Sequence, residues 1–297
     1  MFLPIPTPAL MSTPMLRRTR MHKATHPRST LLRGMQLHAA LALACAAPLG
    51  PAMAQTPATI APAVVNSGAV PTAVCTARSS ATVAPVVELY TSEGCNSCPP
   101  ADKWLSRLKA DPNVVGLAFH VDYWDRLGWK DRFASPAYTQ RQAQQQASNG
   151  ARFSYTPQVV LDGRDHKDWY AATPPSSARS RATATVALAL VREGERITAT
   201  VQPAANAPAR LAAFWAVTEN GHATAVKAGE NDGVTLTHDF VVREYTPVAA
   251  WVAQPGTPVS LSFTPTLAAS PNHPRHVNLV VLDAATGRPV QALKLGC

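Results

Sequence analysis

The sequence predicts an α/β domain followed by an antiparallel, sandwich-like all-β domain. Two observations lead to this fold class. Between residues 83 and 170, short apolar runs alternate with a helical pattern, which is typical of strand–helix–strand units. From residue 181 onward, β-prone segments alternate apolar and polar residues and are separated by turn sequences, which is typical of an antiparallel sandwich. A chain of 297 residues is long enough for both domains.

Residues 1–54 have the composition of a cleaved secretory signal peptide. Six Lys and Arg residues and no acidic residue precede an apolar run over 37–49, and Ala52-Met53-Ala54 provides a small-residue cleavage site. The alternatives are an organellar transit peptide, which is also Arg-rich and free of acids, and a lipoprotein signal ending at Cys45. We therefore expect a periplasmic or secreted protein.

The net charge of +9 does not indicate a nucleic-acid partner. Removing residues 1–54 takes away six of the 27 basic residues and none of the 18 acidic ones, which leaves +3. A mature chain with such balanced charge lacks the basic footprint of nucleic-acid-binding proteins. No run of 18 apolar residues follows the signal, so we also expect no membrane span.

The α/β domain is expected over residues 83–170, after a flexible linker over 55–82 that is rich in Ala, Pro and Thr. Its first strand is predicted at Val86–Tyr90, a β-prone run. A helix is expected over 99–110. Two prolines open this segment at positions where backbone N–H groups have no intrahelical partner, and an apolar stripe follows them.

The second strand of the α/β domain is predicted over 114–121, because an unbroken apolar run is typical of a parallel strand that is buried on both faces. An insertion of polar and aromatic residues over 122–150 follows it. A third strand is predicted over 158–163, directly after Thr156-Pro157.

The β domain is expected over residues 181–297, after a linker over 171–180 that contains two adjacent prolines. A turn at 193–195 joins the first two alternating segments into a hairpin. Its strands are predicted over 185–191, 197–201, 211–218, 234–242, 248–252, 259–263, 277–282 and 290–294.

Five cysteines are present, and Cys45 leaves with the signal peptide. The remaining four allow three pairings in an oxidising compartment. Cys95 and Cys98 form a local C-x-x-C pair, which leaves Cys75 and Cys297 for a structural disulfide. The alternative is that both end cysteines are unpaired, although a stray thiol is a liability outside the cytoplasm.

Several stretches of the chain resemble known proteins. A C-x-x-C after a first strand and a Thr-Pro before a later strand resemble the thioredoxin fold. A secreted family catalogued as domain of unknown function 1223 (DUF1223) is more closely similar. The similar stretches are Val87–Asp102, Phe119–Asp125, Leu127–Asp131, Tyr155–Gln158, Gly229–Gly233 and Val241–Arg243.

The resemblance covers about residues 83–297 and implies an α/β thioredoxin-like domain, an appended β region and export. It implies no activity. The chain departs from ordinary thioredoxins because Gly94, rather than a tryptophan, precedes Cys95, and because its insertion is longer. Substrate choice therefore does not carry over.

The catalytic candidates are Cys95, Cys98 and Glu88. Cys95 would attack as a thiolate, which backbone N–H groups at a helix start favour and the neighbouring Glu93 disfavours. Cys98 would then resolve the mixed disulfide. Glu88 lies in the first strand and, if buried, would relay a proton to Cys98. The alternative is an ion-paired or edge-facing glutamate.

The resemblance to thioredoxins further implies that Pro157 is a cis-proline that faces the dithiol. It would present the backbone of Thr156 to an extended segment of a substrate. Tyr155, Thr156 and Pro157 are therefore the substrate-binding candidates.

We expect an exported thiol–disulfide oxidoreductase that acts on the cysteines of a partner protein without a cofactor. One alternative is a copper- or zinc-binding protein that uses the same thiols, with His120 as a further copper ligand. The other is a noncatalytic interaction module with a structural Cys95–Cys98 disulfide. We assign no metal site, because zinc requires four ligands and no second C-x-x-C is present.

Overall fold

The computed structural model describes residues 74–171, 175–176 and 181–297. The predicted signal peptide lies outside the described residues, as does the predicted linker up to residue 73. The rest of that linker differs from the prediction, because Cys75–Arg78 form strand β1 and pair with β6 (Val186–Glu193). No helix in the described part of the chain is long and apolar enough to cross a membrane.

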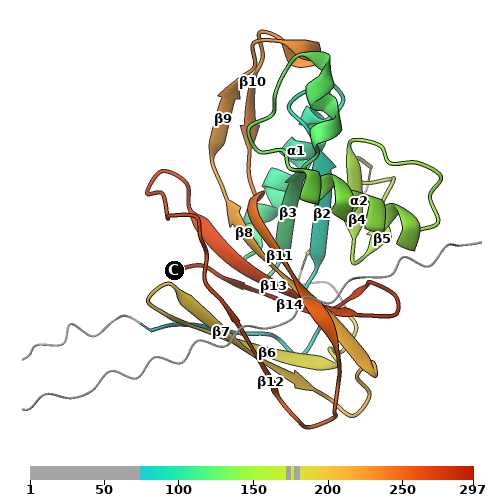
Figure 1. Ribbon diagram of the computed structural model, residues 1–297, viewed down its shortest axis with the longest axis vertical. Coiled ribbons are helices and arrows are strands. Elements are labelled where there is room, and N and C mark those ends of the chain that lie inside the picture. Colours follow the sequence, from blue (N-terminus) through green and yellow to red (C-terminus); the bar gives the residue numbers. More distant parts are fainter. Residues whose placement is uncertain (1–73, 172–174, 177–180) are drawn as a thin grey trace, which may run out of the picture. The chain divides into compact units, whose positions relative to one another are not determined.

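The central element is a mixed sheet of eight strands (Figure 1). Its strands follow the order β14 (Pro289–Leu295), β13 (Arg275–Asp283), β8 (Arg210–Glu219), β11 (Val241–Val252), β3 (Val115–His120), β2 (Val86–Thr91), β4 (Gln158–Leu161) and β5 (Arg164–Asp165). Strands β2 and β3 are parallel, and β4 is antiparallel to β2. Strand β11 joins the two halves of the sheet, because Val241 pairs in parallel with Ala118 of β3.

The predicted fold class, an α/β thioredoxin-like domain followed by an antiparallel all-β domain, is therefore wrong. Strands dominate the described residues, which contain only two α-helices, α1 (Pro99–Ser106) and α2 (Pro136–Ser148). Strands from both predicted domains share one sheet. The physical reason is that an open strand edge pairs with any suitable extended neighbour. The apolar pattern of β3 shows that it is buried but not that β11 is its partner.

A second sheet has the order β1, β6, β7 (Arg196–Pro203) and β12 (Val259–Phe263). A separate hairpin pairs β9 (His222–Ala225) with β10 (Thr235–His238), and β10 contacts α1. Three short 3-10 helices complete the described elements: η1 (Arg107–Ala110), η2 (Asp122–Leu127) and η3 (Gly229–Asn231).

Helix α1 begins where the sequence predicts, and α2 begins with the same signal, a proline in its first turn. Two prolines occupy the first turn of α1, and Trp104 and Leu105 bury its apolar face. In the predicted insertion, α2 begins at Pro136, and the hydroxyl of Ser135 accepts a hydrogen bond from the Ala137 N–H at 3.3 Å.

The eight-stranded sheet carries apolar side chains on both faces. On one face, a single core extends from β2 across to β14, with Tyr90 stacked on Phe119 and Tyr138 of α2 against it. The other face is covered twice. Its β8–β13–β14 half packs on the four-stranded sheet, where Trp215 stacks on Phe263, and its β2–β3–β4 half packs on α1 around Trp104.

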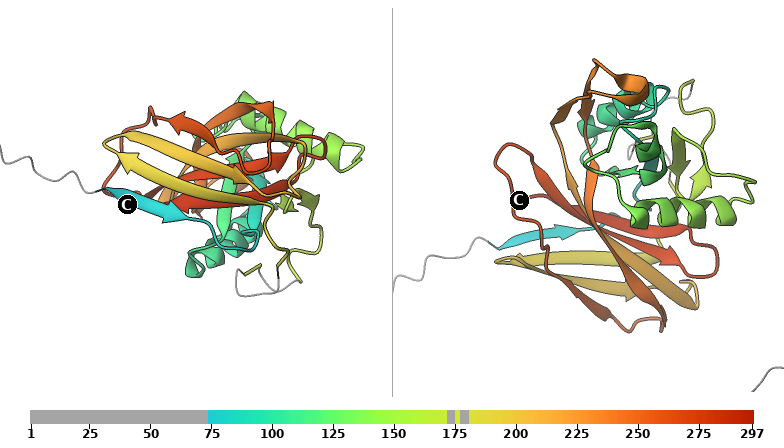
Figure 2. Two further views of the ribbon diagram at one scale, coloured as in Figure 1. Left: turned by 90° about the horizontal axis from the view of Figure 1, so that it is seen from below. Right: turned by 45° about the horizontal axis from the view of Figure 1, so that its top comes forward.

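The two sheets are also joined covalently. Cys75 at the start of β1 and Cys297 after β14 form a disulfide, with a Cα–Cα distance of 6.3 Å. Figure 2 shows the start of β1 beside the C-terminus. The disulfide thus connects the edge strand of the four-stranded sheet to the end of the eight-stranded sheet.

Phe240 fixes the junction between the hairpin and the central sheet. Its φ of 56° lies in the left-handed region, which bulky residues rarely adopt. Its carbonyl accepts a hydrogen bond from the N–H of Ala118 at 2.8 Å, and Asn220 Oδ1 accepts one from its N–H at 2.7 Å. Its ring lies against Gly116, where a Cβ atom would come within 2.9 Å of it. This close packing holds β10 near β3.

Candidate functional site

The two cysteines of the C-x-x-C lie between the end of β2 and the start of α1. Cys95 and Cys98 form a disulfide with a Cα–Cα distance of 5.5 Å. Both cysteines are 0% exposed, whereas Asn96 and Ser97 between them are exposed. Solvent therefore meets the loop that links the cysteines but not their sulfur atoms.

Hydroxyl groups surround the sulfur of Cys95. The hydroxyl of Thr156 donates a hydrogen bond to Cys95 Sγ at 3.3 Å, and Ser97 Oγ lies 3.4 Å from the same atom. Trp124 donates its indole N–H to Thr156 Oγ1 at 2.8 Å and packs on Gly94, where a Cβ atom would lie 3.1 Å from the tryptophan Cβ. Trp124 and Thr156 thus cover the disulfide.

The structure brings only part of the predicted substrate-binding segment to the cysteines. Thr156 contacts Cys95, and the Thr156–Pro157 peptide bond is cis. Tyr155 instead donates its hydroxyl to Asp165 Oδ1 at 2.7 Å. Burial raises the pKa of Tyr155, and the hydrogen bond with Asp165 raises it further. The Tyr155 side chain is therefore engaged by the β5 edge.

Glu88 lies on the opposite face of the sheet from α1. Strand alternation directs its neighbours Val87 and Leu89 toward α1, and Glu88 toward α2. There, Arg141 Nε donates to Glu88 Oε2 at 3.0 Å, and its terminal nitrogen donates to Oε1 at 2.7 Å. The structure thus does not place Glu88 beside Cys98, and its arrangement is that of the ion-paired alternative.

The 3-10 helix η3, in the C-terminal half of the chain, contacts the backbone of the C-x-x-C segment. The amide of Asn231 in η3 donates to the carbonyl oxygens of Glu93 at 2.8 Å and Cys95 at 3.0 Å. Glu230 Oε2 accepts a hydrogen bond from the N–H of Asn96 at 3.0 Å. Two consecutive residues of η3 therefore fix the backbone on both sides of Cys95.

Two buried carboxylates flank the C-x-x-C in the sequence and face one histidine. His238 Nε2 lies 3.4 Å from Glu93 Oε1, and His238 Nδ1 lies 3.9 Å from Asp102 Oδ1. All three side chains are buried. Burial alone would lower the pKa of His238, but Asp102 and Glu93 outweigh it and raise that pKa to about 9. His238 is therefore cationic at neutral pH.

A second buried histidine–carboxylate contact adjoins this group. His120 Nδ1 lies 2.7 Å from Asp131 Oδ2, and the His120 ring centroid lies 5.0 Å from that of His238. Asp131 Oδ2 also accepts a hydrogen bond from the N–H of Glu93 at 2.9 Å. Burial would raise the pKa of Asp131, but His120 and the backbone N–H groups lower it. His120 is thus a core histidine with a carboxylate partner.

The raised pKa of His238 predicts a pH-dependent stability. Because the folded value of about 9 exceeds the ordinary 6.5, this contribution is fully present below pH 6.5 and is lost as the pH rises through 9. We expect the free energy of unfolding to fall by up to about 3 kcal/mol over this range. His238→Gln should remove this decline. Urea unfolding of both proteins at several pH values checks it, and equal slopes would contradict it.

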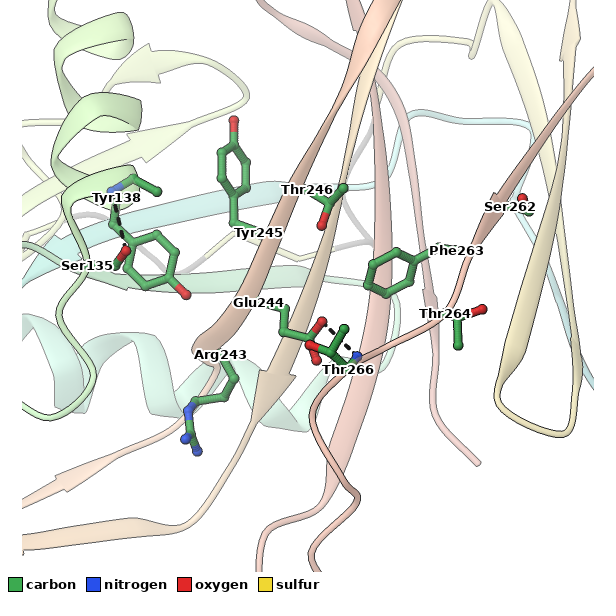
Figure 3. Close-up of a pocket in the computed structure, with 11 residues that line it drawn as sticks. Ser135, Tyr138, Arg243, Glu244, Tyr245, Thr246, Ser262, Phe263, Thr264 and Thr266 are labelled. Atoms are coloured by element: carbon green, nitrogen blue, oxygen red, sulfur yellow. Dashed lines mark hydrogen bonds between the residues drawn. The ribbon is translucent and has the colours of Figure 1, made fainter. Parts of the chain in front are cut away.

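An open groove of about 550 Å³ lies away from the predicted site residues. Figure 3 shows Ser135 and Tyr138 of the α2 region on one side of it, Glu244 and Tyr245 of β11 in the middle, and Phe263 of β12 on the other side.

Within the described residues, no group of three or more His, Cys, Asp or Glu side chains could hold a metal ion.

The sequence over residues 86–282 matches the family described as "Protein of unknown function (DUF1223)", which is about two thirds of the chain. The chain belongs to this family. The resemblance to DUF1223 is thereby confirmed, and the matched range extends from β2 to β13, across both predicted domains.

Solved structures are also similar to this DUF1223 chain. A crystal structure of a protein from Agrobacterium tumefaciens is 28% identical, has a TM-score of 0.54 and covers 72% of this chain and 94% of its own. HBP35 of Porphyromonas gingivalis is 15% identical, has a TM-score of 0.50 and covers 73% of this chain and 76% of its own. The second similarity concerns the fold alone. No curated protein matches the chain.

Several residues of the DUF1223 site were not predicted. Asn231 lies in one of the stretches that support the family resemblance, Gly229–Gly233, but nothing in that stretch indicates what it contacts. Asp102 follows Cys98 by one helical turn, a spacing that the sequence does show. His238 follows Cys98 by 140 residues in the chain, and the hairpin places it beside the C-x-x-C.

Proposed function

We propose that this protein is an exported thiol–disulfide oxidoreductase, periplasmic or secreted, that exchanges the Cys95–Cys98 disulfide with cysteines of a partner protein. The observation that carries the proposal is the hydrogen bond from Thr156 Oγ1 to Cys95 Sγ at 3.3 Å. A hydroxyl donor beside a sulfur stabilises the thiolate that exchange requires.

The two cysteines have different roles in this proposal. Cys95 is the attacking residue, because its sulfur is the one near the hydroxyls of Thr156 and Ser97. In the reducing direction, the Cys95 thiolate of the reduced pair attacks a partner disulfide, breaks its S–S bond and releases one partner sulfur as a thiolate. Deprotonated Cys98 then attacks Cys95 Sγ in the mixed disulfide, releases the second partner sulfur as a thiolate and closes the Cys95–Cys98 disulfide. The oxidising direction reverses these steps. Two electrons move between the partner and the C-x-x-C in each cycle.

Exchange also requires that the cover over the disulfide opens. Both cysteines are 0% exposed, so a partner reaches Cys95 only when Trp124, which is half-buried, leaves its contact with Gly94 and Thr156. Asn96 and Ser97 are already exposed and offer the first contact. Trp124→Ala should therefore speed the reduction of Cys95–Cys98 by a small dithiol.

Trapping in cells tests the proposal. Cys98→Ser should accumulate mixed disulfides through Cys95, because nothing resolves them. Cys95→Ser should accumulate far fewer, because the hydroxyls of Thr156 and Ser97 contact Cys95 rather than Cys98, which lies directly before α1. Nonreducing gels of the exported protein, followed by identification of the trapped partners, measure both. Cys75→Ser alone leaves Cys297 as a free thiol and is the control for capture by any free thiol. Equal capture by all variants would refute the proposal.

The reduction potential of the purified protein separates the proposal from its alternatives. A Cys95–Cys98 couple between about −270 and −120 mV supports exchange, whereas a value below about −300 mV indicates a structural disulfide. Retention of one copper or zinc ion per reduced chain, with both thiols protected from alkylation, would instead support metal binding.

A further inference from the structure

A role of His238 in the ionisation of the dithiol rests on the proposed function of the C-x-x-C. Glu93 precedes Cys95 by two residues, and Asp102 follows Cys98 by four, so the two carboxylates enclose the cysteines in the sequence. His238 lies between them, 3.4 Å from Glu93 and 3.9 Å from Asp102. The His238 imidazole therefore contacts both the residue that leads into the C-x-x-C loop, Glu93, and a residue in the first turn of α1, Asp102.

The charges around the cysteines would otherwise oppose a thiolate. A buried carboxylate disfavours a second negative charge nearby, and two of them flank this loop. The indole N–H of Trp129 donates to Glu93 Oε2 at 2.8 Å, and Thr91 Oγ1 donates to Asp102 Oδ2 at 3.1 Å. These neutral donors leave the negative charges uncompensated, so a protonated His238 is the group that balances them.

Other titratable groups also face His238. The His120–Asp131 pair adjoins its ring from β3, and His222 is its register partner on β9. His222 Nε2 has its own carboxylate, Glu219 Oε2, at 2.9 Å. Lys103 and His238 also line the same small cavity.

That cavity connects His238 with water. It has a volume of about 80 Å³ and is lined by Pro99, Asp102, Lys103 and His238 together with β10. This is large enough to hold water molecules. Protons can therefore reach the His238 ring although the side chain is buried.

We infer that His238 is a positioning residue of the dithiol, which acts through Glu93 and Asp102 and makes the Cys95 thiolate form at a lower pH. When the reduced pair ionises, the Cys95 thiol loses its proton to water, and no electrons move in this step. The cation on His238 offsets the carboxylates at that moment. Once His238 is deprotonated at high pH, this assistance ends.

Titration of the thiolate tests the inference. The ultraviolet absorbance of the reduced protein, minus that of the oxidised protein, reports the thiolate fraction at each pH. In His238→Gln, half-ionisation should move upward by about one pH unit or more, which is about a tenfold loss of thiolate at neutral pH. His222→Gln is the matched control, because it alters the same hairpin but a different carboxylate pair, and it should leave the curve unchanged.

A measurement on the wild type keeps the inference testable if His238→Gln does not fold. In the wild type, linkage requires the thiolate to stabilise the cation in return, so NMR should show His238 losing its proton at a higher pH in the reduced protein than in the oxidised one.

The thiolate curves and the His238 titrations decide the inference. An upward shift of at least half a pH unit in His238→Gln but not in His222→Gln supports the inference, as does a redox-dependent His238 titration. An unshifted curve, equal shifts in both histidine variants, or identical His238 titrations in both redox states would overturn it. Since these measurements need no partner protein, their failure leaves the trapping result intact, and failed trapping does not affect them.

Discussion

Arg141→Met is expected to destabilise the protein by about 3–5 kcal/mol. Arg141 and Glu88 are 6% and 1% exposed at their side chains, and two hydrogen bonds of 2.7 and 3.0 Å join them. Methionine fills similar space but leaves the Glu88 carboxylate buried without its cation. Tyr90 and Gln145 still donate to Glu88, at 2.5 and 3.0 Å, but they carry no positive charge.

Two comparisons isolate the buried charge as the cause. The double variant Glu88→Leu/Arg141→Met replaces the whole pair by apolar side chains and should recover part of the loss, because no charge is then buried alone. It does not recover all of it, since Tyr90 and Gln145 lose their acceptor. Lys109→Met breaks an ion pair with Asp239 in which the lysine side chain is 47% exposed, and it should cost less than about 1 kcal/mol. Urea unfolding at neutral pH measures all three. A loss in Arg141→Met no larger than that in Lys109→Met would show that the pair is not a structural anchor.

This pair also shows why the role of Glu88 could not be predicted. Its position in an apolar run indicates burial, and a buried carboxylate fits either a proton relay or an ion pair. The direction of its side chain depends on which face of β2 meets α1, and its partner Arg141 lies 53 residues away in a helix with a largely polar sequence. Periodicity shows that a side chain is buried but does not reveal its charged neighbour.

The fold was predictable at the level of elements. The strands at β2 and β3, the helix start at Pro99 and the hairpin of β6 and β7 follow from apolar periodicity, proline position and turn sequence. The predicted fold class was wrong because strands from both predicted domains share one sheet, in which β11 pairs with β3 through Val241 and Ala118. That pairing depends on backbone hydrogen bonds and on Phe240 against Gly116, and neither leaves a periodic signal in the sequence.

The candidate site was predictable where the chain is local. The C-x-x-C spacing indicates Cys95 and Cys98, and the family resemblance points to Thr156. The residues that determine the charge and backbone position of this loop come from far along the chain, Asn231 and His238 above all. They reach it because the β9–β10 hairpin contacts α1. Residues that are far apart in the sequence meet at this site because of how the strands pair and where the hairpin packs. Patterns in a single sequence do not reveal those contacts.

Removal of the Cys75–Cys297 disulfide is expected to cost about 5 kcal/mol in the chain-entropy model, with measured losses for native disulfides of about 2–5 kcal/mol. The reason is its sequence separation of 222 residues. In the unfolded chain this link closes almost the whole described region into a loop, and in the folded chain it joins β1 to the end of β14. Cys75→Ala/Cys297→Ala should lower the urea midpoint accordingly.

The other disulfide provides the matched control. Cys95 and Cys98 are separated by only three residues, so the same model gives about 2 kcal/mol for their link. Cys95→Ala/Cys98→Ala should therefore cost clearly less than Cys75→Ala/Cys297→Ala when both are measured by urea unfolding without reductant. Reduced wild type should unfold at the same urea concentration as a variant in which all four of these cysteines are replaced by alanine. If the two double variants lose equal stability, loop entropy does not account for the long disulfide, and its contribution comes instead from contacts between the two sheets.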